Sequence, residues 1–76
     1  MIKNTDLDKK IIDSFNLGNV YQENGDFEQA IGAYKRSLAL KPDYVEALNN
    51  LANVLKKQGK FKRALEVYNK ALQLKP

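Results

Sequence analysis

Cysteine and histidine are both absent from this sequence of 76 residues. The chain therefore contains no disulfide, no thiol nucleophile, no Ser-His triad and no zinc site built on these two residue types. No apolar run approaches the roughly 20 residues that a membrane-spanning helix needs. Acidic residues also interrupt the first 13 residues, where a signal peptide requires an apolar core. We expect a soluble, untargeted, cytoplasmic protein that carries no metal or cofactor.

The residues of common catalytic sites are missing as well. Asp6 and Asp8 lack the further oxygen ligands and the glycine of a calcium-binding loop. Gly18, Gly25 and Gly32 occupy helix-packing or turn positions and do not form a phosphate-binding loop. We therefore predict that the protein is not an enzyme and that its function lies in binding.

One segment occurs twice in the chain. Residues 16–42 (NLGNVYQENGDFEQAIGAYKRSLALKP) return 34 residues later as residues 50–76 (NLANVLKKQGKFKRALEVYNKALQLKP). A shared period with shared turn residues indicates one structural unit that is built twice. The matching pairs include Asn16 with Asn50, Leu17 with Leu51, Asn19 with Asn53, Val20 with Val54, Gly25 with Gly59, Phe27 with Phe61, Ala30 with Ala64, Tyr34 with Tyr68, Leu38 with Leu72 and Leu40 with Leu74.

Turn residues divide the chain into four predicted helices. Gly25 and Gly59 end the first and third helices, because glycine adopts the left-handed conformation at little cost. Pro42 ends the second, since proline cannot continue the hydrogen-bond ladder. The first helix is expected to start near Asp6, inside an amino-terminal extension of residues 1–10.

Side-chain caps are predicted for three of these helices. Each predicted cap is followed three residues later by an acidic or amide side chain, as in a capping box. The pairs are Thr5 with Asp8, Asp26 with Gln29 and Asp43 with Glu46. Lys60 stands where the fourth helix would need an acceptor, so we expect its first turn to be less stable by about 1 kcal/mol.

Apolar residues at steps of three and four predict one buried stripe on each helix. The predicted buried positions are Ile11, Phe15, Leu17, Gly18, Val20 and Tyr21 in the first helix, Phe27, Ala30, Ile31, Tyr34 and Leu38 in the second, Val45, Leu48, Leu51, Ala52 and Leu55 in the third, and Phe61, Ala64, Leu65, Tyr68 and Leu72 in the fourth.

The two copies resemble the tetratricopeptide repeat, a helical hairpin with a 34-residue period. The residues that carry the resemblance are Leu17, Gly18, Tyr21, Gly25, Ala30, Tyr34, Ser37 and Pro42 in one copy and Leu48, Leu51, Ala52, Leu55, Gly59, Ala64, Tyr68, Ala71 and Pro76 in the other. The resemblance implies an all-α fold of two tandem antiparallel helix-turn-helix repeats, residues 11–44 and 45–76. Its four helices would form a short right-handed superhelical stack.

In proteins that this chain resembles, the first helix of each repeat lines a concave groove that holds a peptide or a helix. The resemblance thus implies a protein-interaction module that acts as a scaffold or adaptor. The implied groove residues are Ile12, Phe15, Asn16, Asn19, Gln22 and Glu23 in one repeat and Glu46, Asn49, Asn50, Asn53, Lys56 and Lys57 in the other.

Asn16, Asn19, Asn50 and Asn53, with Lys56 and Lys57, are the candidate peptide-binding residues. Asparagine offers both a donor and an acceptor, so a row of asparagines can pair with an extended peptide backbone of any sequence. The same residues also fit a structural role in which they satisfy neighbouring helices. The sequence leaves both interpretations open.

Positive charge is concentrated in the second half of the chain. Residues 1–44 carry six basic and seven acidic side chains, whereas residues 45–76 carry seven and two. This basic half is expected to be a solvated face or to favour an acidic peptide.

Nucleic acid is not an expected partner, because only Phe61 is interleaved with the lysines. Phe15 replaces the lysine of the carboxylate clamp that some relatives use for chaperone tails, which argues against that ligand.

A second hypothesis is structural. Leu65, Leu72 and Leu74 on the last helix are expected to be partly uncovered, and an exposed apolar patch usually marks an interface. The chain would then be a truncated or designed array whose open ends associate by stacking or by exchange of helices, without a dedicated ligand.

Overall fold

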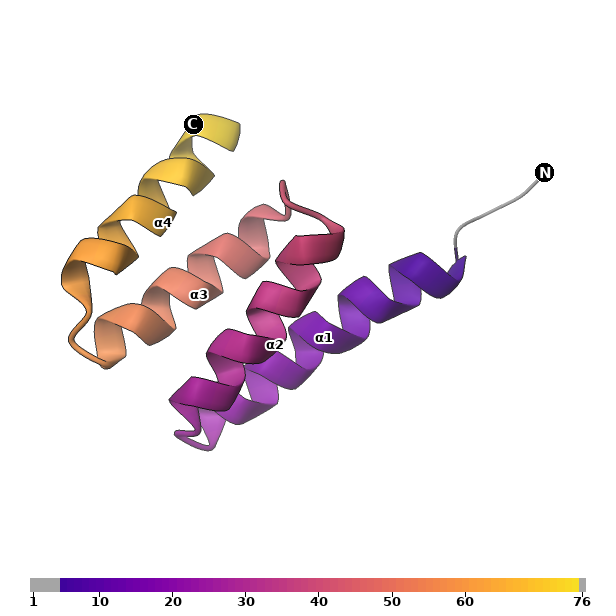
Figure 1. Cartoon of the computed structure of the whole chain (residues 1–76), viewed down its shortest axis with the longest axis horizontal. Helices are drawn as coiled ribbons and strands as arrows, with labels where there is room; N and C mark the ends of the chain where they lie inside the picture. Colours follow the sequence, from indigo (N-terminus) through magenta and orange to yellow (C-terminus); the bar gives the residue numbers. More distant parts are fainter. Residues whose placement is uncertain (1–4, 76) are drawn as a thin grey trace.

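The computed structural model describes residues 5–75, which form four α-helices (Figure 1). Helix α1 spans Thr5–Glu23, α2 spans Phe27–Leu40, α3 spans Val45–Lys57 and α4 spans Phe61–Leu74. Figure 1 shows α3 between α2 and α4, with α4 at one edge of the molecule. The molecule measures 45 × 29 × 14 Å along its principal axes. The predicted all-α fold of stacked helical hairpins is confirmed.

A single glycine turn joins the two helices of each hairpin. Gly25 and Gly59 both have φ of +81°, a conformation that residues with a Cβ rarely adopt. The amide of Asp26 donates to the Tyr21 carbonyl at 2.8 Å, and the amide of Lys60 makes the equivalent bond at 2.9 Å. This is the Schellman arrangement, in which the turn satisfies the last carbonyls of the helix. The prediction that glycine ends α1 and α3 is confirmed.

The predicted side-chain caps at Asp26 and Asp43 are wrong. Asp26 makes no side-chain cap bond, and its backbone conformation (φ −86°, ψ 71°) nearly equals that of Lys60 (φ −90°, ψ 67°). The glycine turn fixes this conformation, so the residue type at the position does not change it. Helix α3 begins after Tyr44 instead of Asp43, and the Asp43 carboxylate lies 3.7 Å from the ammonium group of Lys41. The side chain of Thr5 lies outside the described residues.

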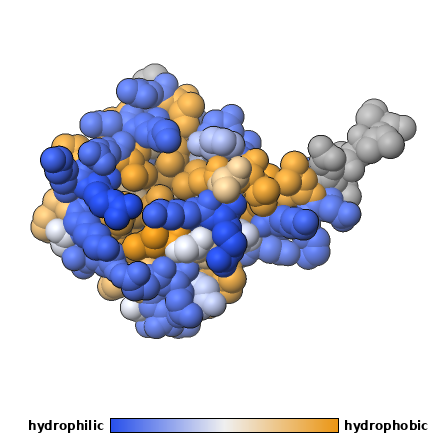
Figure 2. Space-filling model, viewed as in Figure 1, coloured by the Kyte–Doolittle hydropathy of each residue, from blue (hydrophilic) through white to orange (hydrophobic). Residues whose placement is uncertain are grey.

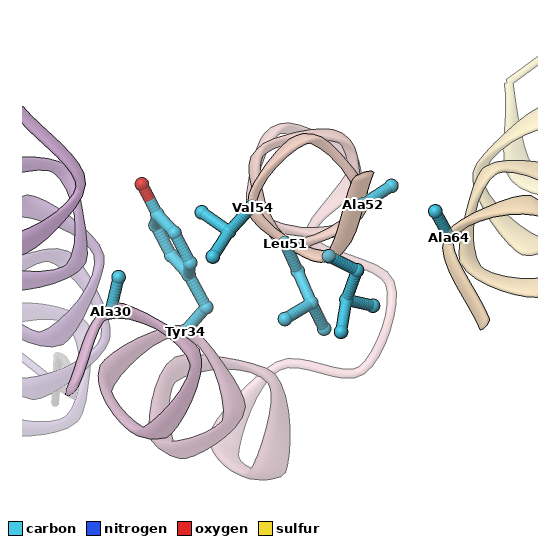
Figure 3. Packing of buried hydrophobic residues seen from close by; sticks show 7 residues of the cluster. Ala30, Tyr34, Leu51, Ala52, Val54 and Ala64 are labelled. Carbon is cyan, nitrogen blue, oxygen red and sulfur yellow. The ribbon is translucent and has the colours of Figure 1, made fainter. Parts of the chain in front are cut away.

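The core lies between the two hairpins and centres on Tyr34 of α2. Its ring is fully buried and, in Figure 3, lies between Ala30 and Val54 of α3. Ala52 of α3 and Ala64 of α4 face each other in the same view. The small alanine pair lets α3 and α4 approach closely.

One helix contact requires glycine. A Cβ atom at Gly18 of α1 would lie 2.5 Å from Cε1 of Tyr34, far inside contact distance. The hydroxyl group of Ser37, which is fully buried, donates to the carbonyl of Ile11 at 2.9 Å. These two contacts fix α2 against α1 at two points of the shared surface.

The predicted stripes are correct for the inner helices and partly wrong for the outer ones. Within residues 5–75, helices α1 and α4 are each covered on one side only, so part of each stripe meets solvent. The stripe positions that are exposed are Leu17, Val20, Phe61, Leu65 and Leu72, and the fully buried positions that the stripes missed are Ala33, Ser37, Ala47 and Val54.

Candidate functional site

A continuous hydrogen-bond network joins α1, α2 and α3. The Tyr34 hydroxyl donates to Oδ1 of Asn19, and Nδ2 of Asn50 donates to the same oxygen at 2.9 Å. Nε2 of Gln22 donates to the Tyr34 hydroxyl at 2.9 Å. Nζ of Lys57 lies 3.4 Å from Oε1 of Gln22. The two repeats are therefore linked by polar side chains as well as by the apolar core.

One bond of this network recurs in the second repeat. The Tyr68 hydroxyl donates to Oδ1 of Asn53, as the Tyr34 hydroxyl does to Asn19. In each repeat the tyrosine on the second helix thus bonds to the asparagine 15 residues before it. These two asparagine oxygens have structural roles, which is one of the two interpretations that the sequence left open.

Burial keeps Tyr34 in its neutral form. Burial raises the pKa of the Tyr34 phenol above its ordinary value of 10.0, and the negative charge of Glu23 raises it further. The hydrogen bond from Gln22 and the nearby amide of Asn50 oppose this rise in pKa. Tyr34 therefore remains a hydrogen-bond donor to Asn19 throughout the physiological pH range.

The structure brings four of the six candidate peptide-binding residues into bonded pairs or networks and leaves two without a side-chain hydrogen bond within residues 5–75. Asn19, Asn50 and Lys57 belong to the Tyr34 network, and Asn53 bonds to Tyr68. Asn16 and Lys56 are exposed and have no side-chain hydrogen bond to any residue between 5 and 75.

We call the surface of α1 and α3 that carries the candidate residues the α1/α3 face. Its residues are Ile12, Phe15, Asn16, Asn19, Gln22 and Glu23 from α1 and Glu46, Asn49, Asn50, Asn53, Lys56 and Lys57 from α3. Phe15 is half-buried on this face, with its ring centroid 5.0 Å from that of Tyr44 and 6.0 Å from that of Tyr34.

A shallow hollow of about 310 Å³ lies at the amino-terminal end of α1 and α3. It is lined by Asp8, Ile11, Ile12, Lys41 and Tyr44. Ile12 is 50% exposed, and Figure 2 shows hydrophobic surface on the part of α1 that adjoins the grey amino-terminal residues. The α1/α3 face thus has an apolar hollow at one end and two lysines at the other.

The three leucines that the sequence singled out for self-association are all exposed. Leu65, Leu72 and Leu74 on α4 have exposed fractions of 59%, 57% and 46%. Phe61, at the start of the same helix, is the most exposed large apolar side chain of the described residues, at 65%. The apolar surface of α4 is therefore wider than the three leucines predicted from the sequence.

Sequence reasoning missed the hydroxyl groups that organise the site. It assigned Tyr34 and Tyr68 to the core by their spacing and did not ask what their hydroxyl groups bond to. The available signal was the recurrence of tyrosine, where phenylalanine would pack equally well, in step with Asn19 and Asn53. A phenol that is kept at a buried position needs a hydrogen-bond partner.

Stacked antiparallel helical hairpins, in which the same tyrosine–asparagine hydrogen bond recurs 34 residues later, define a helical repeat protein. A sequence profile of the tetratricopeptide repeat matches residues 10–76. The chain belongs to the tetratricopeptide repeat family, as the resemblance of its two copies predicted.

Two individual proteins show how the chain relates to longer members. It is 44% identical over 36 residues to the photosystem I assembly protein Ycf3 of Acaryochloris marina, and this match covers 47% of the chain and 22% of Ycf3. It resembles the crystal structure of MamA with a TM-score of 0.82 at 26% identity, over 84% of the chain and 37% of MamA. The chain therefore spans only about a fifth of Ycf3 and about a third of MamA.

Membership of this family gives the general function. Tetratricopeptide repeats mediate protein–protein interaction and serve as non-catalytic scaffolds. No helix within residues 5–75 has both the length and the apolar character needed to cross a membrane. The same part of the chain contains no group of three or more acidic side chains arranged to hold a metal ion.

Proposed function

We propose that the chain is a cytoplasmic scaffold module that binds an extended peptide along its α1/α3 face. The observation that carries this proposal is the hydrogen bond between the side-chain amides of Asn19 and Asn50. It uses Oδ1 of Asn19 and Nδ2 of Asn50, and neither Nδ2 of Asn19 nor Oδ1 of Asn50 bonds to any residue between 5 and 75. One donor and one acceptor therefore remain on two neighbouring side chains, and a peptide unit requires one of each.

The two ends of the face favour different side chains on the ligand. The hollow beside Ile12 and Tyr44 suits an aliphatic or aromatic side chain. Lys56 and Lys57 lie in the last turn of α3 and are exposed, so they suit an acidic side chain.

The length of the face sets the spacing of these two ligand groups. Eleven residues of α1 separate Ile12 from Glu23, which is about 17 Å at 1.5 Å per helical residue. An extended peptide covers this distance in about five residues. The preferred ligand therefore carries an apolar and an acidic side chain about five residues apart.

Fluorescence anisotropy with three labelled peptides tests this function. Two of them carry one leucine and one glutamate at the stated spacing, in opposite orders. The third has lysine in place of glutamate. We expect one acidic peptide to bind and the lysine peptide to bind more weakly. Lys57→Ala is expected to weaken binding about two- to fivefold, the usual effect of one exposed charge, whereas Lys70→Ala on α4 has no effect. The proposal is wrong if neither acidic peptide binds, or if the two variants behave alike.

A further inference from the structure

The contact between the two repeats provides a template for the outer ends of the molecule. Val54 and Leu51 of α3 point toward α2 and are buried, with exposed fractions of 0% and 5% (Figure 3). Their equivalents in the first repeat, Val20 and Leu17 of α1, are 50% and 39% exposed. Helix α1 thus presents to solvent the same apolar positions that α3 uses to bind a preceding repeat.

Helix α4 presents the other half of this contact. Phe27, Ile31 and Leu38 of α2 are half-buried and pack against the core cluster. Their equivalents 34 residues later are Phe61, Leu65 and Leu72, which are 65%, 59% and 57% exposed. Leu74 differs, because its equivalent Leu40 stays 42% exposed even though a repeat is stacked on α2.

The polar side chains of the two ends are also complementary. Lys57 donates to Gln22 across the internal contact, and the residues equivalent to this pair are Glu23 and Lys56. Glu23 stands at the position of Lys57, and Lys56 stands at the position of Gln22. The outer ends therefore carry opposite charges, whereas the inner contact pairs a cation with a neutral amide. This pair would form an ion pair if the two ends met.

Amide side chains repeat the same correspondence. Asn50 donates to Asn19 across the internal contact, and the equivalent residues at the outer ends are Asn16 and Asn53. Asn16 is exposed and Oδ1 of Asn53 already accepts from Tyr68, as Oδ1 of Asn19 accepts from Tyr34.

We propose that the chain stacks head to tail on a second copy of itself, with α1 of one copy on the α3/α4 end of the other. The contact repeats the internal one, with Leu17 and Val20 on Leu65 and Leu72 and with an ion pair between Glu23 and Lys56. Because the two surfaces are different, the contact leaves a free end on each copy and builds an open array. Stacking is a separate proposal from peptide binding, although Glu23 and Lys56 belong both to this contact and to the α1/α3 face.

Asp13 opposes this contact. It stands where the second repeat has Ala47, which is fully buried. Asp13 is exposed and its carboxylate lies 3.0 Å from the ammonium group of Lys9. Stacking would remove this carboxylate from water, so the contact is weaker than its apolar area alone would make it.

Two variants, each with a substitution that disrupts one of the two contact surfaces, test the proposal by sedimentation equilibrium over a concentration series. Val20→Glu damages the α1 end and Leu72→Glu damages the α4 end, both at exposed positions where circular dichroism should show unchanged helicity. Each variant alone is expected to have the mass of one chain. Their equimolar mixture is expected to reach the mass of two chains and no more, because only one intact contact can form. Wild type and the control Leu74→Glu are expected to exceed two chains.

Wild-type protein that keeps the mass of one chain up to its solubility limit would overturn the proposal. So would a mixture of the two variants that stays monomeric, since this outcome would point to a symmetric contact or to exchange of helices. Asp13→Ala provides an independent check that does not depend on damaged ends. It is expected to shift association to concentrations about fivefold lower or more, and unchanged association would contradict the stacked arrangement.

Discussion

At the scale of single residues, the Tyr34 hydroxyl links three helices that the apolar core alone would only place near each other. It accepts a hydrogen bond from Gln22 and donates one to Asn19, which in turn accepts from Asn50 of the next repeat. Tyr68 makes only the bond to Asn53 within the described residues and is half-buried. The two equivalent tyrosines therefore differ in what their hydroxyl groups contribute to stability.

Replacement of these tyrosines should show this difference. Tyr34→Phe leaves the Gln22 amide without its acceptor in a partly buried site and should lower the free energy of unfolding by about 1 to 3 kcal/mol. Tyr68→Phe loses one bond near solvent and should cost about 0.5 to 1.5 kcal/mol. Urea unfolding of the two variants measures both values. Equal losses would mean that the link to the second repeat adds nothing.

The same hydroxyl predicts how stability depends on pH. Burial and Glu23 raise the pKa of Tyr34 above 10.0, so both the folded and the unfolded chain hold the proton below that pH, and the stabilisation is complete. At higher pH the unfolded chain loses the proton first, and stability falls until the folded phenol also ionises. Burial and Glu46 raise the pKa of Tyr44 as well, so Tyr34→Phe should reduce the alkaline loss without abolishing it. Parallel losses in variant and wild type would contradict this assignment.

At the scale of helices, Gly18 determines how closely α1 and α2 pack. Gly18→Ala should lower the free energy of unfolding, because the added methyl group must displace the Tyr34 ring, at a cost of about 1 to 3 kcal/mol. The better helix propensity of alanine returns up to about 1 kcal/mol of this cost.

Gly32→Ala is the matched control for this prediction. Gly32 lies inside α2, and the nearest atom to an added Cβ is Nη1 of Arg36 at 4.0 Å. The substitution should therefore stabilise the protein by up to about 1 kcal/mol through helix propensity. Thermal unfolding that shifts in the same direction for both variants would show that the Tyr34 ring moves aside at no cost.

Helix ends show which sequence rules transfer to the structure. Gly25 and Gly59 end α1 and α3 as predicted, because a positive φ is a strong local requirement that few other residues meet. The cap at Asp26 was mispredicted, since a capping side chain also needs an extended backbone that the preceding glycine turn does not provide. The cap at Asp43 was mispredicted because α3 begins after Tyr44, one residue later. The part of the predicted stability difference between α2 and α4 that was due to a cap hydrogen bond therefore has no structural basis. The charge difference between Asp26 and Lys60 remains.

At the scale of the whole molecule, the 34-residue period predicted the fold, because the resemblance fixed the helix order and the stacking together. It did not predict which side of each outer helix is covered, since Leu17 and Leu51 are the same residue type in the same position. Exposure depends on the neighbouring repeat and is therefore not a local property of the sequence. The same holds for the hydrogen bond between Asn19 and Asn50, which exists only because α3 stacks on the first hairpin.

Unequal coverage of the helices predicts unequal protection of their amides. Helix α3 has six buried side chains and lies between two helices, whereas α4 has only Ala64 and Ala71 buried. Local opening should therefore release α4 at a lower free energy than α3. Hydrogen exchange measured by NMR on dilute protein should show the smallest protection factors in α4 among the helices of the second repeat. Uniform protection across α3 and α4 would indicate a single cooperative unit instead.

The shortest dimension of the molecule, 14 Å, has a consequence for how such proteins gain stability. A globule gains interior faster than surface as it grows, so each added residue is on average better buried than the last. A body that lengthens at constant thickness keeps the same ratio of interior to surface, and each further unit adds a fixed increment of free energy through its one new contact. For this chain, adding units would raise stability in equal steps, with no size at which a deeper core begins.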